Sequence, residues 1–126
     1  METGNNGFKK LLKSFGFAFA GLNELLKSEQ NARIHLLATI GALIAGVFLR
    51  ISSLEWGVIL IVIALVWVAE AFNTAIEKLT DHFFNDYNKT ARIAKDISAA
   101  AVLVCAITAF VCGLIVFLPK VISLFS

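Results

Sequence analysis

Five polar residues recur along one otherwise apolar stretch of the sequence. Glu70, Asn73, Thr74, Glu77 and Asp81 are separated mainly by Ala, Phe, Ile and Leu. In a helix with about 100° per residue, these five side chains share one face about 100° wide. Carboxylates are rare and costly in a membrane-spanning helix, where they indicate a functional site. Three carboxylates on one face suit a hard divalent cation such as Mg²⁺, which takes oxygen ligands and bridges phosphates.

This polar stripe could instead serve only to hold helices together. Its carboxylates would then pair with basic residues of neighbouring helices, such as Arg33, Arg92 or Lys95. Three carboxylates are more than helix association requires, which favours a functional site. Glu29 lies at the same predicted membrane boundary as Glu77, so a metal ion between these two carboxylates is sterically plausible.

Two further features near this boundary each have two interpretations. His35 could be a metal ligand, but a lone His at a membrane boundary more often forms interfacial hydrogen bonds. The charged cluster that opens the last predicted helix could anchor the cytoplasmic side, or it could offer Lys95 to a phosphate group. The cluster consists of Lys89, Arg92, Lys95 and Asp96.

Motifs of soluble nucleotide-binding proteins are absent from the sequence. It contains no GxxxxGK[ST], GxGxxG, HRD or DFG pattern, which excludes a nucleotide site of the ordinary soluble-kinase type. The formal net charge is +2, and no basic run is interleaved with aromatic residues. We therefore expect no nucleic-acid partner.

The composition is that of a membrane protein. Hydrophobic residues make up 59% of the 126 positions, and the mean hydropathy is +0.83. Soluble domains are roughly 45–50% apolar, and a water-soluble fold of this length could not hide the excess. Cys105 and Cys112 lie in the most apolar segment without a pairing or metal-binding pattern, so we interpret them as small hydrophobic residues.

Periodicity predicts an all-α membrane protein with a single domain (1–126). Apolar residues recur every three or four positions over residues 8–27, which is typical of an amphipathic helix on a membrane surface. Long apolar runs predict membrane-spanning helices at 33–50, 55–84 and 89–119. We expect the turn residues 85–88 to separate the last two helices and Pro119 to end the last one.

Basic residues beside the predicted spans indicate the orientation. Nine Lys or Arg residues flank one side and two flank the other, which places the N-terminus in the cytoplasm and the C-terminus outside. The polar first residues form no signal peptide, so we expect the chain to begin at Met1. Three helices enclose little volume, and their small residues permit close packing, so we expect a homo-oligomer.

Two segments resemble the prokaryotic diacylglycerol kinase family, whose Gram-positive-type members are undecaprenol kinases. The segment E-A-F-N-T-A-I-E-K-L-T-D at 70–81 is similar to the family signature E-x-x-N-[ST]-A-[IV]-E-x-x-x-D. The segment A-K-D-I-S-A-A-A-V-L at 94–103 also resembles the family, as do Gly21-Leu22 and the pair Glu29 and Arg33. The resemblance covers about residues 7–119.

This resemblance implies a homotrimer whose active sites are shared between subunits, with ATP as phosphoryl donor and Mg²⁺ as cofactor. Glu70 matches the general base, and Glu29 and Glu77 match the metal-binding glutamates, which also contact the nucleotide. Further positions match nucleotide contacts, namely Lys10, Phe17, Asp86, Tyr87, Asn88, Lys95 and Asp96, with Lys10 and Phe17 standing where Arg and Tyr are common. Other positions match lipid-associated or polar active-site residues, namely Ser14, Arg33, Asn73, Asp81 and Ser98.

The sequence thus predicts an enzyme of a bacterial cytoplasmic membrane that phosphorylates a lipid hydroxyl, of diacylglycerol or of undecaprenol, at the cytoplasmic interface. One alternative is a small oligomeric ion or proton conduit with Glu70 as a relay, and another is a structural membrane protein. A conduit needs polar positions along whole helices, whereas residues 97–118 carry no charge. A structural role leaves the carboxylates and Lys95 at one depth unexplained.

Overall fold

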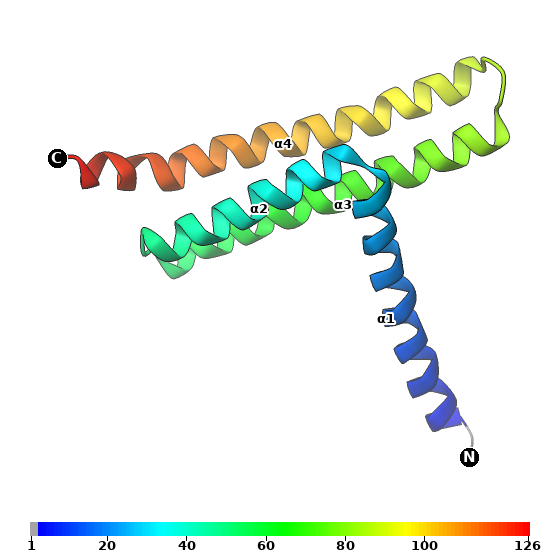
Figure 1. Ribbon diagram of the computed structural model, residues 1–126, viewed down its shortest axis with the longest axis horizontal. Coiled ribbons are helices and arrows are strands. Elements are labelled where there is room, and N and C mark those ends of the chain that lie inside the picture. Colours follow the sequence, from blue (N-terminus) through cyan, green and yellow to red (C-terminus); the bar gives the residue numbers. More distant parts are fainter. Residues whose placement is uncertain (1–2) are drawn as a thin grey trace.

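The computed structural model describes the backbone of residues 3–126 and the side chains of residues 6–126. Over this range the chain forms four helices and no strand: α1 (Thr3–Ser28), α2 (Gln30–Phe48), α3 (Ser53–Phe83) and α4 (Lys89–Leu124). Three of them, α2, α3 and α4, are long and apolar enough to cross a membrane. They run side by side, whereas α1 leaves this bundle at a steep angle (Figure 1). The predicted all-α membrane fold is confirmed.

A sharp corner separates α1 from α2. Glu29 has an extended backbone there and is the N-cap of α2. The last carbonyls of a helix lack partners within the helix. Here Arg33 is the hydrogen-bond donor to two of these carbonyls. Its Nε donates to the Leu26 carbonyl at 3.1 Å and its Nη2 to the Lys27 carbonyl at 3.1 Å. Leu25 is buried at the same corner. One side chain of α2 therefore stabilises the end of α1.

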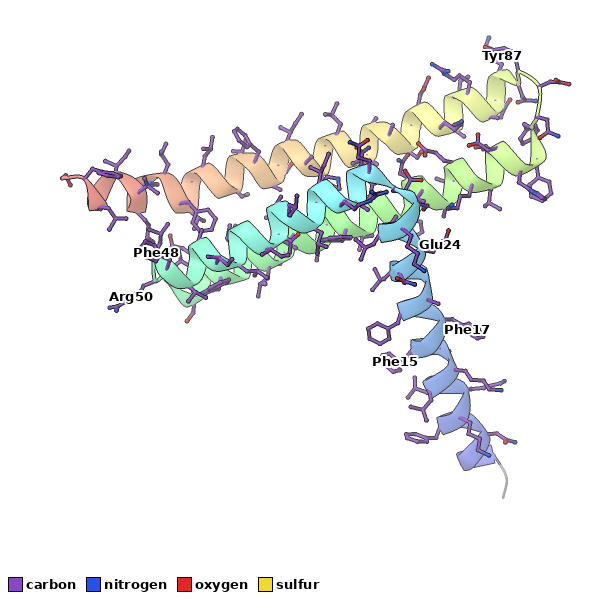
Figure 2. The ribbon with its side chains drawn as sticks, in the orientation of Figure 1. Phe15, Phe17, Glu24, Phe48, Arg50 and Tyr87 are labelled. Atoms are coloured by element: carbon purple, nitrogen blue, oxygen red, sulfur yellow. The ribbon has the colours of Figure 1, made fainter. Side chains whose placement is uncertain are left out.

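The apolar side chains of α1 have no protein partner along most of its length. Phe15 and Phe17 are both exposed. They project to opposite sides of α1, and Phe15 points toward the side on which the bundle extends to Arg50 (Figure 2). Phe15 thus points as an apolar side chain of a membrane-surface helix should, toward the hydrocarbon that the bundle crosses.

The far end of the bundle is closed by a short connection between α2 and α3. Arg50 adopts a positive φ of 53° there. Ser52 and Glu55 form a capping box, in which each side chain bonds the other residue's backbone N–H. Lys120 of α4 adds an ion pair to Glu55 at 3.1 Å. The ion pair ties α4 to the start of α3, and the short connection joins α3 to α2 at this end.

The contact between α3 and α4 is the most extensive in the fold, and α2 packs mainly on α3. Ile51, Ile59 and Val116 form a small buried cluster. Only 6% of the most apolar window of α4 is buried within the chain. Much of the surface of α4 must therefore face lipid or another protein chain.

The helix bounds differ from the sequence expectation mainly at the two ends of the chain. The α1 helix begins at Thr3, ahead of the predicted start at residue 8. The predicted end at Pro119 is wrong, because α4 continues to Leu124. Proline removes one backbone hydrogen bond, to the carbonyl four residues earlier, but membrane helices tolerate this loss. The ion pair from Lys120 to Glu55 also holds the turn that follows.

Candidate active site

Asn73 connects α3 to α4 inside the bundle. The hydroxyl of Ser98 donates to Asn73 Oδ1 at 2.7 Å, and both residues are buried. Asn73 Nδ2 donates in turn to Glu77 Oε1 at 3.4 Å. Buried polar groups are costly unless they are paired, so this contact fixes the register of the two helices. It also orients the half-buried Glu77 carboxylate.

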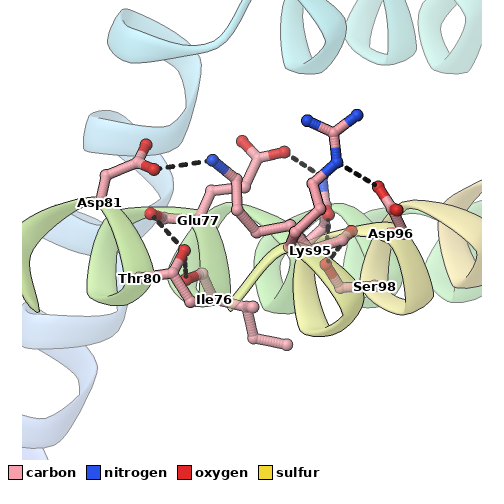
Figure 3. A network of polar contacts seen from close by, with 9 residues as sticks. Ile76, Glu77, Thr80, Asp81, Lys95, Asp96 and Ser98 are labelled. Carbon is pink, nitrogen blue, oxygen red and sulfur yellow. Dashed lines mark hydrogen bonds and ion pairs between the residues drawn. The ribbon is translucent and has the colours of Figure 1, made fainter. Parts of the chain in front are cut away.

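A second cross-helix contact lies nearer the loop between α3 and α4. Lys95 Nζ contacts Asp81 Oδ1 at 2.7 Å, and the Ser98 hydroxyl also shares its hydrogen with the Lys95 carbonyl at 2.9 Å (Figure 3). Asp96 instead pairs along its own helix with Arg92 at 3.4 Å, and both side chains are exposed. Lys95 is therefore the cation of α4 that joins the polar stripe of α3.

A small hollow of about 150 Å³ opens beside this contact, where α3 turns into α4. Asn88 is the N-cap of α4, and its Oδ1 accepts a hydrogen bond from the Ala91 N–H at 3.0 Å. Ligand pockets usually measure roughly 300–1,000 Å³, so this hollow can hold only part of a nucleotide. Its polar lining consists of seven residues, Thr80, Asp81, Asp86, Tyr87, Asn88, Arg92 and Lys95.

Glu70 is the most enclosed ionisable residue of the described chain. Its relative exposure is 1%. Its Oε2 atom accepts no hydrogen bond from the residues described, and the same holds for the neighbouring Thr74 hydroxyl. A buried carboxylate without hydrogen bonds is costly. Such groups in a stable fold require an explanation, and a catalytic role is one of the usual ones.

The sequence pattern favoured an interfacial hydrogen-bonding role for His35 and did not place it beside Glu70. Its Nε2 lies 3.5 Å from Glu70 Oε2, which brings α2 to the polar stripe of α3. A nearby hydrogen bond from Trp67 Nε1 to Thr39 Oγ1, at 2.9 Å, joins the same two helices. The spacing of residues along α2 could not reveal the contact of His35 with Glu70, because that contact depends on the register between α2 and α3.

A mostly apolar groove of about 290 Å³ runs between α2, α3 and α4. His35 and Thr39 are the polar residues in its lining, and the remainder is formed by residues such as Ile63, Val66 and Phe110. The groove therefore has a polar end beside Glu70 and apolar walls along the bundle.

The chain alone does not bring every predicted residue to this site. Phe17 lies on the part of α1 that projects from the bundle (Figure 2), and Ser14 and Lys10 precede it on the same helix. The Ser14 hydroxyl bonds the Lys10 carbonyl at 3.0 Å. The guanidinium of Arg33 is occupied by the carbonyls that end α1.

Glu29 and Glu77 offer oxygen ligands of the kind that Mg²⁺ prefers. Glu29 is half-buried and makes no capping hydrogen bond with its side chain. Among the described residues, no group of three or more His, Cys, Asp or Glu side chains is placed to hold a metal ion. Mg²⁺ is usually bound through one or two carboxylates together with substrate phosphates and water, so two glutamates are compatible with it.

Comparison with known proteins identifies the family of the chain. The model of the prokaryotic diacylglycerol kinase family matches residues 16–117. The chain belongs to the prokaryotic diacylglycerol kinase family. The resemblance seen in the sequence is thereby confirmed, and the protein is a lipid kinase by membership. The match includes the predicted residues from Phe17 to Ser98 and leaves Lys10 and Ser14 outside.

Three relatives show the breadth of this family. The chain is 36% identical to the undecaprenol kinase of Bacillus subtilis, over 91% of this chain and 94% of the relative. It is 35% identical to a diacylglycerol kinase of Synechocystis, over 90% of this chain and 66% of that protein. It is 27% identical to the diacylglycerol kinase of Escherichia coli, over 88% of this chain and 91% of the relative.

Proposed function

We propose that this protein transfers the γ-phosphoryl group of ATP to the hydroxyl of a membrane lipid, either diacylglycerol or undecaprenol. The observation that carries the proposal is the buried Glu70 carboxylate, whose Oε2 has no hydrogen-bond partner in the described chain. Such a group can accept a proton from a hydroxyl that approaches from the lipid side. The two relatives of nearly equal identity carry different lipid names, so both lipids stay in the proposal.

The reaction forms one bond and breaks one bond at phosphorus. The lipid hydroxyl oxygen bonds to the γ-phosphorus, the bond to the bridging β–γ oxygen breaks, and ADP leaves. Glu70 accepts the hydroxyl proton. Phosphoryl transfer needs mostly positioning and charge stabilisation from the protein, which the fixed register of α3 and α4 supports.

The nucleotide lies at the shallow end of the polar stripe in this proposal. Lys95 leaves Asp81 to contact phosphate oxygens, as a Lys ammonium commonly does. Glu29 and Glu77 would hold Mg²⁺, which when bound neutralises phosphate charge. The hollow between α3 and α4 would hold part of the nucleotide, with contacts from Asp86, Tyr87, Asn88 and Asp96.

The lipid side of the site uses residues closer to the membrane. Ser98 and Asn73 hold the two helices together beside Glu70, while Ser14 and Arg33 would contact the lipid near the surface helix. Lys10 and Phe17 would contact ATP of a neighbouring subunit, because they lie away from the site of their own chain. This division of residues supports a homotrimer with shared active sites.

The proposed location is a bacterial cytoplasmic membrane, with the N-terminus and the α3–α4 loop in the cytoplasm and the C-terminus outside. The excess of basic residues beside the loop end of the bundle supports this orientation. The steep angle between α1 and the bundle (Figure 1) supports a surface position for α1. ATP and the lipid then meet at the cytoplasmic interface.

The decisive experiment measures transfer of labelled phosphate from ATP to lipid by the purified protein in detergent micelles. Diacylglycerol and undecaprenol are offered side by side, with and without Mg²⁺. We expect a labelled product from at least one lipid, and only when Mg²⁺ is present. If neither lipid is labelled while the protein is shown to be folded, the proposed function is rejected.

A further inference from the structure

His35 is the only ionisable residue of the described chain within ion-pairing distance of Glu70. Its Nε2 lies 3.5 Å from Glu70 Oε2, and the two side chains are 18% and 1% exposed. This distance is longer than a good hydrogen bond. Catalytic hydrogen bonds are often long in an unliganded site and shorten when the substrate binds.

The position of His35 is fixed by a second contact between the same helices. The Thr39 hydroxyl donates to the His35 carbonyl at 2.7 Å and accepts from Trp67 Nε1 at 2.9 Å. Trp67 and Glu70 are three residues apart on α3, so they lie on neighbouring positions of one face. Both therefore engage the single turn of α2 that begins at His35. A histidine held in this way has little freedom to leave Glu70.

His35 also lies at the polar end of the apolar groove, whereas Glu70 is not part of the groove lining. The imidazole therefore stands between the groove and the buried carboxylate. The remaining titratable groups of the polar stripe have other partners in the described chain, since Glu77 accepts from Asn73 and Asp81 pairs with Lys95. His35 is dedicated to Glu70.

We propose that His35 is a positioning residue for Glu70, one that holds the carboxylate of the general base in the orientation in which it receives the proton of the lipid hydroxyl. This inference rests on the proposed lipid kinase function. The imidazole transfers no proton itself. When the lipid binds, the 3.5 Å contact shortens so that Nε2–H donates to Glu70 Oε2, the other carboxylate oxygen receives the lipid proton, and the imidazole shields the carboxylate from the groove.

The test compares His35→Leu with His35→Gln in the full-length protein. Leu removes the donor, whereas the side-chain amide of Gln retains an N–H near the position of Nε2. We expect His35→Leu to lower kcat at least about 10-fold, the usual scale when a partner that orients an active group is lost. The KM values for MgATP and for lipid should change little, because neither substrate loses a contact. His35→Gln should recover much of the lost kcat.

A control separates positioning from simple helix packing. Gly46→Ala disturbs the contact between α2 and α3 far from Glu70, because the new Cβ would meet the Trp56 ring at 2.6 Å. This variant should have a lower melting temperature than wild type, with kcat per folded protein close to the wild-type value. If it loses kcat as His35→Leu does, loosened packing explains the loss and the inference is overturned.

The remaining outcomes also decide the question. If wild type is active and His35→Leu keeps kcat within about twofold of it, the positioning role is rejected while the kinase function stands. If Gln and Leu lower kcat equally and in proportion to the folded fraction, His35 only joins two helices, which also overturns the inference. If wild type labels neither lipid, the proposed function fails first.

Discussion

Glu70 and Glu77 lie on the same face of α3, about 10 Å apart along the helix axis, but only Glu70 is enclosed by the chain. Glu70 is 1% exposed, whereas Glu77 is half-buried and accepts a hydrogen bond from Asn73. One helix face thus carries a deep carboxylate and a shallow one. The deep position suits contact with a lipid hydroxyl, and the shallow position suits contact with a polar nucleotide.

The first prediction concerns the deep carboxylate. Glu70→Gln keeps the size and hydrogen-bonding capacity of the side chain but removes the basic oxygen. We expect turnover to fall by at least about 100-fold, the usual scale for the loss of a general base. MgATP affinity and oligomeric state should persist. Kinetics with labelled ATP, combined with a nucleotide-binding titration, provide the measurement.

Two results would contradict the role of Glu70 as general base. Near-normal turnover of Glu70→Gln would leave Glu70 as part of a structural stripe. Loss of MgATP binding in step with activity would move it to the metal site. The second result would also remove the basis for a positioning role of His35.

The second prediction concerns the shallow carboxylate. Glu77→Gln removes one charge and weakens one oxygen ligand, so MgATP should bind less tightly and more Mg²⁺ should be needed for half-maximal activity. The matched control is Glu24→Gln. Glu24 pairs with Lys78 at 3.8 Å with both side chains exposed, and such surface pairs contribute little. A Glu77→Gln variant with the MgATP affinity of wild type would argue against the metal role.

The polar stripe of α3 could be predicted from the sequence because it needs only the helix period. Glu70, Asn73 and Glu77 fall on one face of any regular helix. The partners of these residues could not be predicted, because they depend on the register between helices. The contact of Ser98 with Asn73 and that of His35 with Glu70 each involve a second helix.

The helix end at Pro119 shows a different limit of the sequence interpretation. The rule that proline ends a helix holds best in water, where the freed carbonyl and the next turn are readily solvated. In an apolar surrounding, leaving the helix would expose more unpaired backbone groups, so continuing it is less costly. Residues on α1, such as Phe17, mark another limit, because a single chain gives them no partner in the site.

The third prediction tests the packing of α2 on α3. Gly46→Ala should lower the melting temperature, because the added Cβ would lie within 2.6 Å to 3.1 Å of three atoms of the rigid Trp56 ring. Overpacking of this kind typically costs about 1–3 kcal/mol. Gly41→Ala on the same helix is the matched control, since its Cβ would meet nothing within 4 Å in the described chain. It should be neutral or stabilising, because Ala favours helix by about 1 kcal/mol over Gly. Equal melting temperatures for the two variants would show that Trp56 moves aside freely.

The fourth prediction asks whether Glu29 and Glu77, the two glutamates proposed to hold Mg²⁺, come from one subunit. Two contacts within the chain lie on either side of them: Glu24 with Lys78, and His35 with Glu70. These contacts show that the α1–α2 corner lies beside α3 of the same chain, so we expect Glu29 and Glu77 to act from the same chain. Subunits carrying Glu29→Ala and subunits carrying Glu77→Ala, each inactive, should therefore remain inactive after mixing and reassembly.

If the two glutamates come from different subunits, the mixture should instead regain activity. If Glu29 and Glu77 met across a subunit interface, random mixing in equal amounts would restore about one quarter of the sites, since each contributing subunit is correct half of the time. A mixture of wild type with the Glu29→Ala/Glu77→Ala double variant is the control. It should retain about one half of the sites if both glutamates act from one chain, and about one quarter if they act from two. Recovery in the first mixture together with the lower value in the second would assign the metal site to the interface. It would also show that the contacts between α1, α2 and α3 of one chain do not bring these two carboxylates together.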